Sequence, residues 1–157
     1  MDVLTRGDQM LKVLIAEDDF IVAGLLEETL SDSGYEVCGV ARTVDEAVAL
    51  GELHKPDLAL LDVRLACGGR GQEIARRLNS KGKFGVLYAT GDNSRTSMLA
   101  QADGDASIAK PYRPEDLLRA LEIVREVATG GTATPPFPPG FRLLSEAPTR
   151  FFEVLPG

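Results

Sequence analysis

Residues 12–19 read KVLIAEDD, so that a short apolar run, Lys12–Ala16, ends in three consecutive acids. A run of this length and composition predicts a strand that is buried on both faces. Apolar residues then recur at helical spacing over 21–30, and Gly34 provides a C-terminal cap. The stretch therefore predicts a β–α unit with acidic side chains at the carboxyl end of its strand.

The same alternation recurs four more times. The further strands are expected at 35–41, 58–61, 84–89 and 106–109. The further helices are expected at 43–53, from after the glycine-rich loop 67–71 to about 78, at 94–102 and at 114–127. Continuous apolar strands that alternate with helices predict a parallel sheet covered on both faces. Because crossovers between parallel strands are right-handed, the expected architecture is an α/β fold with a doubly wound sheet of five parallel strands.

Composition changes at Gly130-Gly131, since the last 28 residues hold six of the nine prolines and four of the six phenylalanines. We therefore divide the chain into an N-terminal extension (1–10), one domain (11–129) and a Pro/Phe-rich C-terminal tail (130–157). The PPFPP segment at 135–139 is incompatible with a helix interior or a central strand and predicts a stiff extended arm. The apolar residues over 141–155 are expected to pack on the chain's own domain or on a second copy.

The overall composition excludes several classes of protein. The chain has 157 residues and a net charge of −7, which argues against general binding to the nucleic-acid backbone. No apolar run is long enough to cross a membrane, and the first ten residues contain no apolar signal core. Cys38 and Cys67 form neither a disulfide framework nor a metal-ligand spacing. We expect a cytoplasmic protein that binds neither nucleic acid nor membranes.

The carboxyl ends of the predicted strands carry a distinctive set of polar residues. They are Glu17 and Asp18 after the first strand, Asp62 after the third, Thr90 after the fourth and Lys110 after the fifth. Parallel strands bring these ends to one edge of the sheet, where sites form in doubly wound folds. Neighbouring carboxylates repel one another unless a cation lies among them, and an oxygen-only set suits Mg²⁺. Asp62 would then attack a phosphoryl group, with Lys110 and Thr90 binding its oxygens.

Four segments, KVLIAEDDF, LALLDVRL, YATG and AKPY, follow one another in this order along the chain. Together they resemble the receiver domain of bacterial two-component response regulators, and the likeness covers about residues 11–128. The resemblance implies a flavodoxin-like strand order of 2-1-3-4-5 and Mg²⁺ as the cofactor. It also implies the site roles: Asp62 as phosphoacceptor, Glu17, Asp18, Asp62 and the backbone carbonyl of Arg64 as metal ligands, Thr90 as switch hydroxyl and Lys110 as phosphoryl contact. Asp19 is not assigned to the acidic pair because it falls at the first turn of the following helix.

Three positions depart from the pattern of this family. Ser107 stands where the family usually has an aromatic residue that swings inward on activation, and Ala66 stands where it usually has a proline. The YATG motif is similar to a subgroup of mostly single-domain receivers with Phe-Ala-Thr-Gly at this point. In that subgroup a tyrosine just after the motif replaces the switch aromatic, whereas this chain has Asn93.

We therefore predict a stand-alone response regulator. A sensor histidine kinase or a histidine phosphotransfer protein would donate the phosphoryl group to Asp62. The output would be a protein–protein contact through the strand 106–109 and the helices 94–102 and 114–127, and a homodimer would form through this face or through the tail.

Two alternatives belong to other classes. The first is a Mg²⁺-dependent phosphohydrolase with an aspartate nucleophile, but such enzymes commonly carry a second aspartate two residues later, where this chain has Arg64. The second is a receiver-like binding module that is never phosphorylated, which would have no need for the acidic set and Lys110.

Overall fold

The computed structural model describes residues 5–6, 9–79, 84–91, 99 and 103–144. Its strands are β1 Thr5–Arg6, β2 Gln9–Met10, β3 Lys12–Ala16, β4 Glu36–Ala41, β5 Leu58–Asp62, β6 Gly85–Thr90, β7 Ala106–Ala109 and β8 Phe141–Leu143. Its helices are α1 Phe20–Asp32, α2 Val44–His54, the short 3₁₀ helix η1 Ala66–Gly68, α3 Gly71–Asn79 and α5 Pro114–Ala128. The helix predicted at 94–102 falls outside the described residues except for Leu99, as does the tail beyond residue 144.

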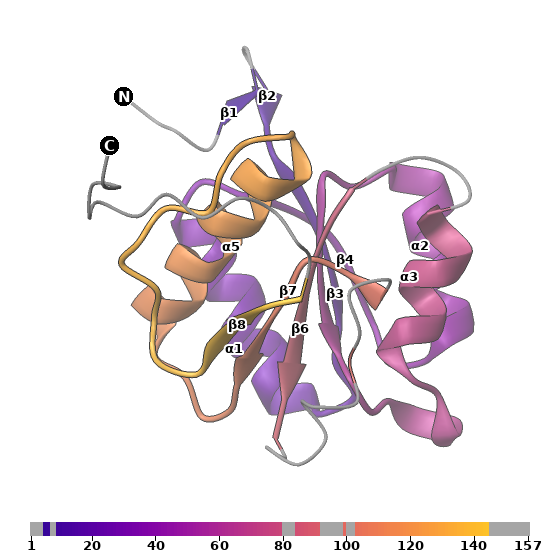
Figure 1. Cartoon of the computed structure of the whole chain (residues 1–157). Coiled ribbons are helices and arrows are strands. Elements are labelled where there is room, and N and C mark those ends of the chain that lie inside the picture. Colours follow the sequence, from indigo (N-terminus) through magenta and orange to yellow (C-terminus); the bar gives the residue numbers. More distant parts are fainter. Residues whose placement is uncertain (1–4, 7–8, 80–83, 92–98, 100–102, 145–157) are drawn as a thin grey trace, which may run out of the picture.

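The central sheet has the order β4-β3-β5-β6-β7-β8 (Figure 1). The first five of these strands are parallel and confirm the predicted order 2-1-3-4-5. The sixth strand, β8, is antiparallel to β7 and was not predicted, so the sheet is larger than the five-stranded sheet expected from the sequence. The N-terminal extension also contains a small antiparallel pair, β1 and β2, for which no strands were predicted.

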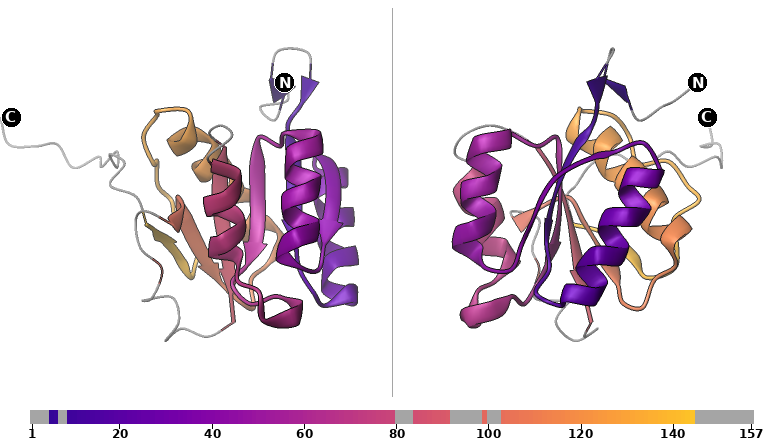
Figure 2. Two further views of the ribbon diagram at one scale, coloured as in Figure 1. Left: turned by 90° about the vertical axis from the view of Figure 1, so that its right-hand side faces the viewer. Right: turned by 180° about the vertical axis from the view of Figure 1, so that it is seen from behind.

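Helices cover both faces of this sheet, as predicted. Figures 1 and 2 show α1 and α5 on one face and α2 and α3 on the other. Each face has its own apolar core. Leu26 and Leu30 of α1 pack with Leu117 and Leu121 of α5 on the first face. On the second face, residues of α2 and α3 pack with the strands, with Ile74 fully buried among them. No helix in the described residues is long and apolar enough to span a membrane.

Side-chain caps fix where α1 and α2 begin. Asp19 precedes α1, and its carboxylate accepts hydrogen bonds from the amides of Ile21 and Val22. Thr43 precedes α2 and accepts from the Glu46 amide, while the Glu46 carboxylate accepts from the Arg42 amide. These caps satisfy amides that have no partner within a helix, and they hold each helix at the carboxyl end of the preceding strand.

Candidate functional site

The polar residues predicted from the strand ends lie together at the carboxyl edge of the sheet. Asp62 is the last residue of β5 and Thr90 the last of β6, while Glu17 and Lys110 directly follow β3 and β7. A pocket of about 340 Å³ opens at this edge. It is lined by Asp18, Asp62, Val63, Arg64, Thr90, Gly91 and Lys110. The structure therefore brings together every site residue that the sequence predicted, with Glu17 buried beneath the pocket.

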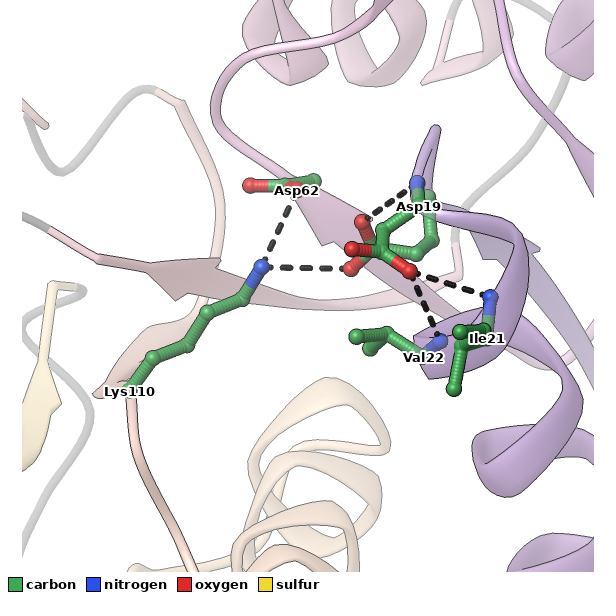
Figure 3. Close-up of polar contacts among 6 residues, drawn as sticks. Asp19, Ile21, Val22, Asp62 and Lys110 are labelled. Carbon is green, nitrogen blue, oxygen red and sulfur yellow. Dashed lines mark hydrogen bonds and ion pairs between the residues drawn. The ribbon is translucent and has the colours of Figure 1, made fainter.

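Lys110 connects the acidic residues of the pocket. Its Nζ donates to Asp62 Oδ2 and to Glu17 Oε1, each at 3.1 Å (Figure 3). The lysine backbone is fixed as well, because Lys110 N donates to Thr90 O at 2.8 Å. The side chain of Asp62 is only 12% exposed and that of Glu17 only 4%, so these ion pairs are largely shielded from water. An ion pair in such surroundings is screened little by salt.

Burial and charge shift the pKa values of two groups in this cluster. Desolvation raises the pKa of the Glu17 carboxyl, and the nearby charge of Asp62 adds to this effect. Burial alone would lower the pKa of Lys110, but the charges and hydrogen bonds of Asp62 and Glu17 outweigh burial and raise it. The lysine is therefore held as an ammonium beside Asp62.

The acidic residues form an oxygen-donor set that fits a hard divalent cation. Glu17, Asp18 and Asp62 each offer one carboxylate oxygen, and the three oxygens lie within 4.8 Å of one another. Oxygen ligands in a small, partly solvated pocket suit Mg²⁺, which keeps several of its waters. Asp19 uses its carboxylate to cap α1, in agreement with the prediction that it stands apart from this set.

The loop after β5 packs against the backbone of Asp62. Gly71 lies against the backbone of Asp62, because a Cβ at this position would overlap the Asp62 carbonyl oxygen. The loop is closed by hydrogen bonds from Gly71 N to Val63 O and from Leu65 N to Gly69 O. Arg64 lies in this loop, two residues after Asp62, and lines the pocket.

A second feature beside the site was not predicted from the sequence. A groove of about 560 Å³ runs between α1 and the start of α5 and shares Gly91 and Lys110 with the acidic pocket. Its other lining residues are Val22, Leu25, Leu26, Thr29, Pro111, Tyr112, Pro114 and Leu117. Ile21 and Leu25 are among the apolar residues that recur at helical spacing over 21–30, but the structure leaves Ile21 73% and Leu25 59% exposed. Phe20 is 84% exposed, so the rim of the site carries an apolar surface on α1.

The signal for this surface was present in the sequence. Apolar residues at positions 20, 21, 22, 25, 26 and 30 form a stripe wider than one helix can bury against a sheet. The structure buries Ala23, Leu26 and Leu30 and packs Val22 partly against the same core. Phe20, Ile21 and Leu25 are left exposed.

Comparison with known proteins agrees with this geometry. The family model of the response regulator receiver domain matches residues 13–122. The transcriptional regulatory protein PdtaR of Mycobacterium tuberculosis is 36% identical over 114 residues, which cover 71% of this chain and 55% of that protein. The phyllosphere-induced regulator PhyR of Methylorubrum extorquens is 32% identical over 112 residues, covering 71% of this chain and 42% of that protein. The chain thus spans about half the length of the curated relatives that it matches.

Among solved structures, the CheY-like response regulator receiver domain protein of Methanospirillum hungatei superposes with a TM-score of 0.65 and 29% identity. The match covers 76% of this chain and 96% of that one. The family consists of signalling proteins, and the relatives named above are regulators rather than enzymes, which argues against the phosphohydrolase alternative. With its family match, its strand order and its acidic pocket, the chain belongs to the response regulator receiver domains of two-component systems.

Proposed function

We propose that this chain accepts a phosphoryl group on Asp62 from a sensor histidine kinase or a histidine phosphotransfer protein, and that it signals through protein–protein contacts. The observation that carries the proposal is the position of Asp62. Its carboxylate lines an open pocket, paired with Lys110 and close to Glu17 and Asp18. A carboxylate with this access and these neighbours is suited to act as a nucleophile.

The chain's own residues have distinct parts in the proposed reaction. One Asp62 oxygen forms a bond to phosphorus while the bond from phosphorus to the donor's imidazole nitrogen breaks, and solvent supplies a proton to the departing imidazole. Lys110 already lies 3.1 Å from Asp62 Oδ2, so its ammonium is placed to bind a phosphoryl oxygen. The Thr90 hydroxyl lines the same pocket and is proposed as a second donor to the phosphoryl group.

The proposed metal site consists of the carboxylates of Glu17, Asp18 and Asp62, with the backbone carbonyl of Arg64 as a further ligand. Bound Mg²⁺ would offset negative charge on the attacking carboxylate and on the phosphoryl oxygens. Before the ion binds, Lys110 occupies one oxygen each of Glu17 and Asp62. A bound ion would therefore place a second positive charge close to the Lys110 ammonium.

The apolar surface on α1 supports a protein as the phosphoryl donor. Phe20, Ile21 and Leu25 are exposed next to a groove that shares Lys110 with the acidic pocket. Exposed apolar patches of this kind mark protein contacts, and this patch lies where a donor must approach Asp62. A small phosphate ester would leave the patch uncovered.

We place the reaction in the cytoplasm, which is consistent with the two free cysteines.

The chemical identity of the modified residue tests this proposal. The full chain is incubated with acetyl phosphate and Mg²⁺, reduced with borohydride and mapped by peptide mass spectrometry. Borohydride converts an aspartyl phosphate into homoserine, which we expect at position 62. Homoserine at another position, or phosphoryl transfer without any homoserine, would contradict the proposal.

A further inference from the structure

The chain beyond α5 returns to the sheet and covers the edge of β7 (Figure 1). The residue pairs of the β7–β8 ladder are Ala106–Leu143, Ser107–Arg142 and Ile108–Phe141. Backbone contacts extend the ladder at both ends, because Ala109 N donates to Gly140 O at 3.1 Å and Leu144 N donates to Asp105 O at 2.9 Å. The edge of β7 is therefore occupied along its length by the chain's own tail.

The returning segment contributes to both apolar cores. Phe141 and Leu143 pack on the face covered by α1 and α5, whereas Leu144 packs with Tyr88 and Leu99 on the other face. The sequence left open whether the tail packs on its own domain or on a second copy; residues 141–144 pack on their own domain. A terminal segment with apolar contacts on both faces of the sheet is an integral part of the folded domain.

Arg119 of α5 holds the segment that connects α5 to β8. Arg119 of α5 donates through its guanidinium to the carbonyl oxygens of Thr134 and Pro136. Ala133 is fully buried, and the rings of Phe137 and Phe141 lie 5.5 Å apart. The tail is thus clamped to α5 before it reaches β7.

β8 is fixed to two different parts of the molecule. At one end, Gly140 packs against Ala109, the residue before Lys110; a Cβ on Gly140 would lie 3.1 Å from the Ala109 Cβ. In its middle, Arg142 Nη2 donates to the carbonyl oxygen of Leu99 at 3.3 Å, and Leu99 belongs to the connection between β6 and β7. β8 therefore bridges the reactive end of β7 and the β6–β7 connection.

The bridge spans residues whose contacts must change when Asp62 is modified. A phosphoryl group on Asp62 places new oxygens between Asp62 and Lys110, which are now in direct contact. The Lys110 ammonium would then contact the new oxygens in place of the free carboxylate, and the lysine backbone is joined both to Ala109 and, through a hydrogen bond, to Thr90. A shift of the end of β7 relative to Leu99 would strain the two contacts that hold β8, namely Gly140 with Ala109 and Arg142 with Leu99.

Ser107 is a buried polar residue of β7 that lies opposite Arg142 of β8. It lies between Tyr88 and Arg142 in the strand register, and it is fully buried. Its hydroxyl oxygen has no hydrogen-bond partner among the described residues. The Ser107 hydroxyl therefore adds no described bond between β7 and β8, and the ladder at this point is held by its backbone hydrogen bonds.

We propose that β8 reports the phosphorylation state of Asp62: it is bound to β7 while Asp62 is unmodified and loosens when Asp62 carries a phosphoryl group. This inference rests on the proposed function and adds its regulation. Arg142 is the positioning residue that couples β8 to the β6–β7 connection. Loosening frees the backbone N–H and C=O groups of the β7 edge, which is the kind of edge that pairs with an extended segment of a partner. A homodimer through this edge requires β8 to leave first.

Hydrogen exchange on the full chain tests the inference. The chain is labelled with deuterium in a buffer that contains Mg²⁺, with and without excess acetyl phosphate. The intact mass of the same samples gives the number of phosphoryl groups per chain. We expect amides at 141–144 to exchange about 5-fold faster or more in the phosphorylated chain, since coupling between sites typically has this magnitude. Full phosphorylation with unchanged or slower exchange at 141–144 overturns the inference alone. Failure to gain a phosphoryl group overturns the proposed function, and the inference falls with it.

A pair of arginine variants tests the role of Arg142. Arg142→Ala removes the contact with Leu99, whereas Arg77→Ala removes an arginine of α3 that is paired with Asp45 and Glu73. Both variants should reach the stoichiometry of the parent chain. In Arg142→Ala the phosphorylation-dependent change at 141–144 should fall below about 2-fold, while Arg77→Ala should keep the full change. A parent-like change in Arg142→Ala would show that Arg142 is not the coupling residue.

Discussion

The ammonium nitrogen of Lys110 lies 3.1 Å from the Asp62 carboxylate, although 48 residues separate the two along the chain. The same nitrogen contacts Glu17, so one lysine from the end of β7 joins acids from the ends of β3 and β5. Before any ion or phosphoryl group arrives, Lys110 is the positive charge that offsets repulsion between these carboxylates. Its positive charge therefore competes electrostatically with that of a metal ion bound beside the same carboxylates.

Replacing Lys110 tests this competition. Lys110→Met should bind Mg²⁺ several-fold more tightly, because a positive charge leaves the neighbourhood of two ligand oxygens. Without metal, the variant should have a lower Tm than the parent chain, since Glu17 and Asp62 remain buried without their cation. It should also be phosphorylated more slowly, because a phosphoryl contact is lost. A metal titration and melts with and without EDTA check the first two outcomes; Mg²⁺ affinity at or below that of the parent would contradict the competition.

Two neighbouring acids form a matched pair for the metal site. Asp18 offers an oxygen to the acidic set, whereas Asp19 caps α1 through the amides of Ile21 and Val22. Asp18→Ala should therefore weaken Mg²⁺ binding and leave the free energy of unfolding nearly unchanged. Asp19→Ala should lower the free energy of unfolding by about 1 kcal/mol and leave Mg²⁺ binding nearly unchanged. Equal effects of the two variants in a metal titration would overturn the assignment of the acidic pair.

The apolar surface on α1 should matter for a protein donor and be irrelevant for a small one. Ile21→Ser removes an apolar side chain that is 73% exposed beside the site, and Leu53→Ser is its control, since Leu53 is equally exposed on α2. Ile21→Ser should slow phosphoryl transfer from a phosphohistidine protein that modifies the parent chain, and leave modification by acetyl phosphate unchanged. Leu53→Ser should leave both rates unchanged. If Ile21→Ser slowed both reactions equally, the surface would not be a donor contact.

The two cysteines should differ in reactivity. Cys38 is half-buried and donates to Val13 O, and burial raises the pKa of its thiol to about 11. Cys67 is exposed in the loop after β5. Because the thiolate is the reactive form, a thiol-alkylating reagent near neutral pH should modify Cys67 rapidly and Cys38 only after unfolding. Peptide mapping gives the site, and rapid labelling of Cys38 in the folded chain would contradict its burial.

The sequence predicts the parallel part of the fold and the site because both depend on strand ends. Each apolar run stops at a polar residue, so strand order alone places Asp62, Thr90 and Lys110 at one edge of the sheet. Asp19 could be separated from the acidic pair for a similar reason, since it stands at a helix start where a cap is expected.

Other features depend on information that local patterns do not carry. β8 has only three residues and follows a proline-rich segment, so its pairing with β7 is decided by burial of Phe141 and Leu143 in a distant core. The exposure of Ile21 and Leu25 depends on how much of α1 the sheet can cover, which helical spacing does not give. The contact of Lys110 with Glu17 is set by side-chain packing within the pocket rather than by strand order.

The intact mass of the chain after incubation with acetyl phosphate and Mg²⁺ tests most directly whether Asp62 is the phosphoacceptor. We predict that the parent chain gains one base-labile phosphoryl group, and that the gain disappears when EDTA removes the ion. Asp62→Asn should gain none while keeping its fold, and its metal-free stability should be equal or higher because one of several like charges is gone. Asp45→Asn, which alters an exposed acid on α2, should be modified like the parent. One equivalent of phosphoryl group on Asp62→Asn would contradict the assignment of Asp62 as the phosphoacceptor.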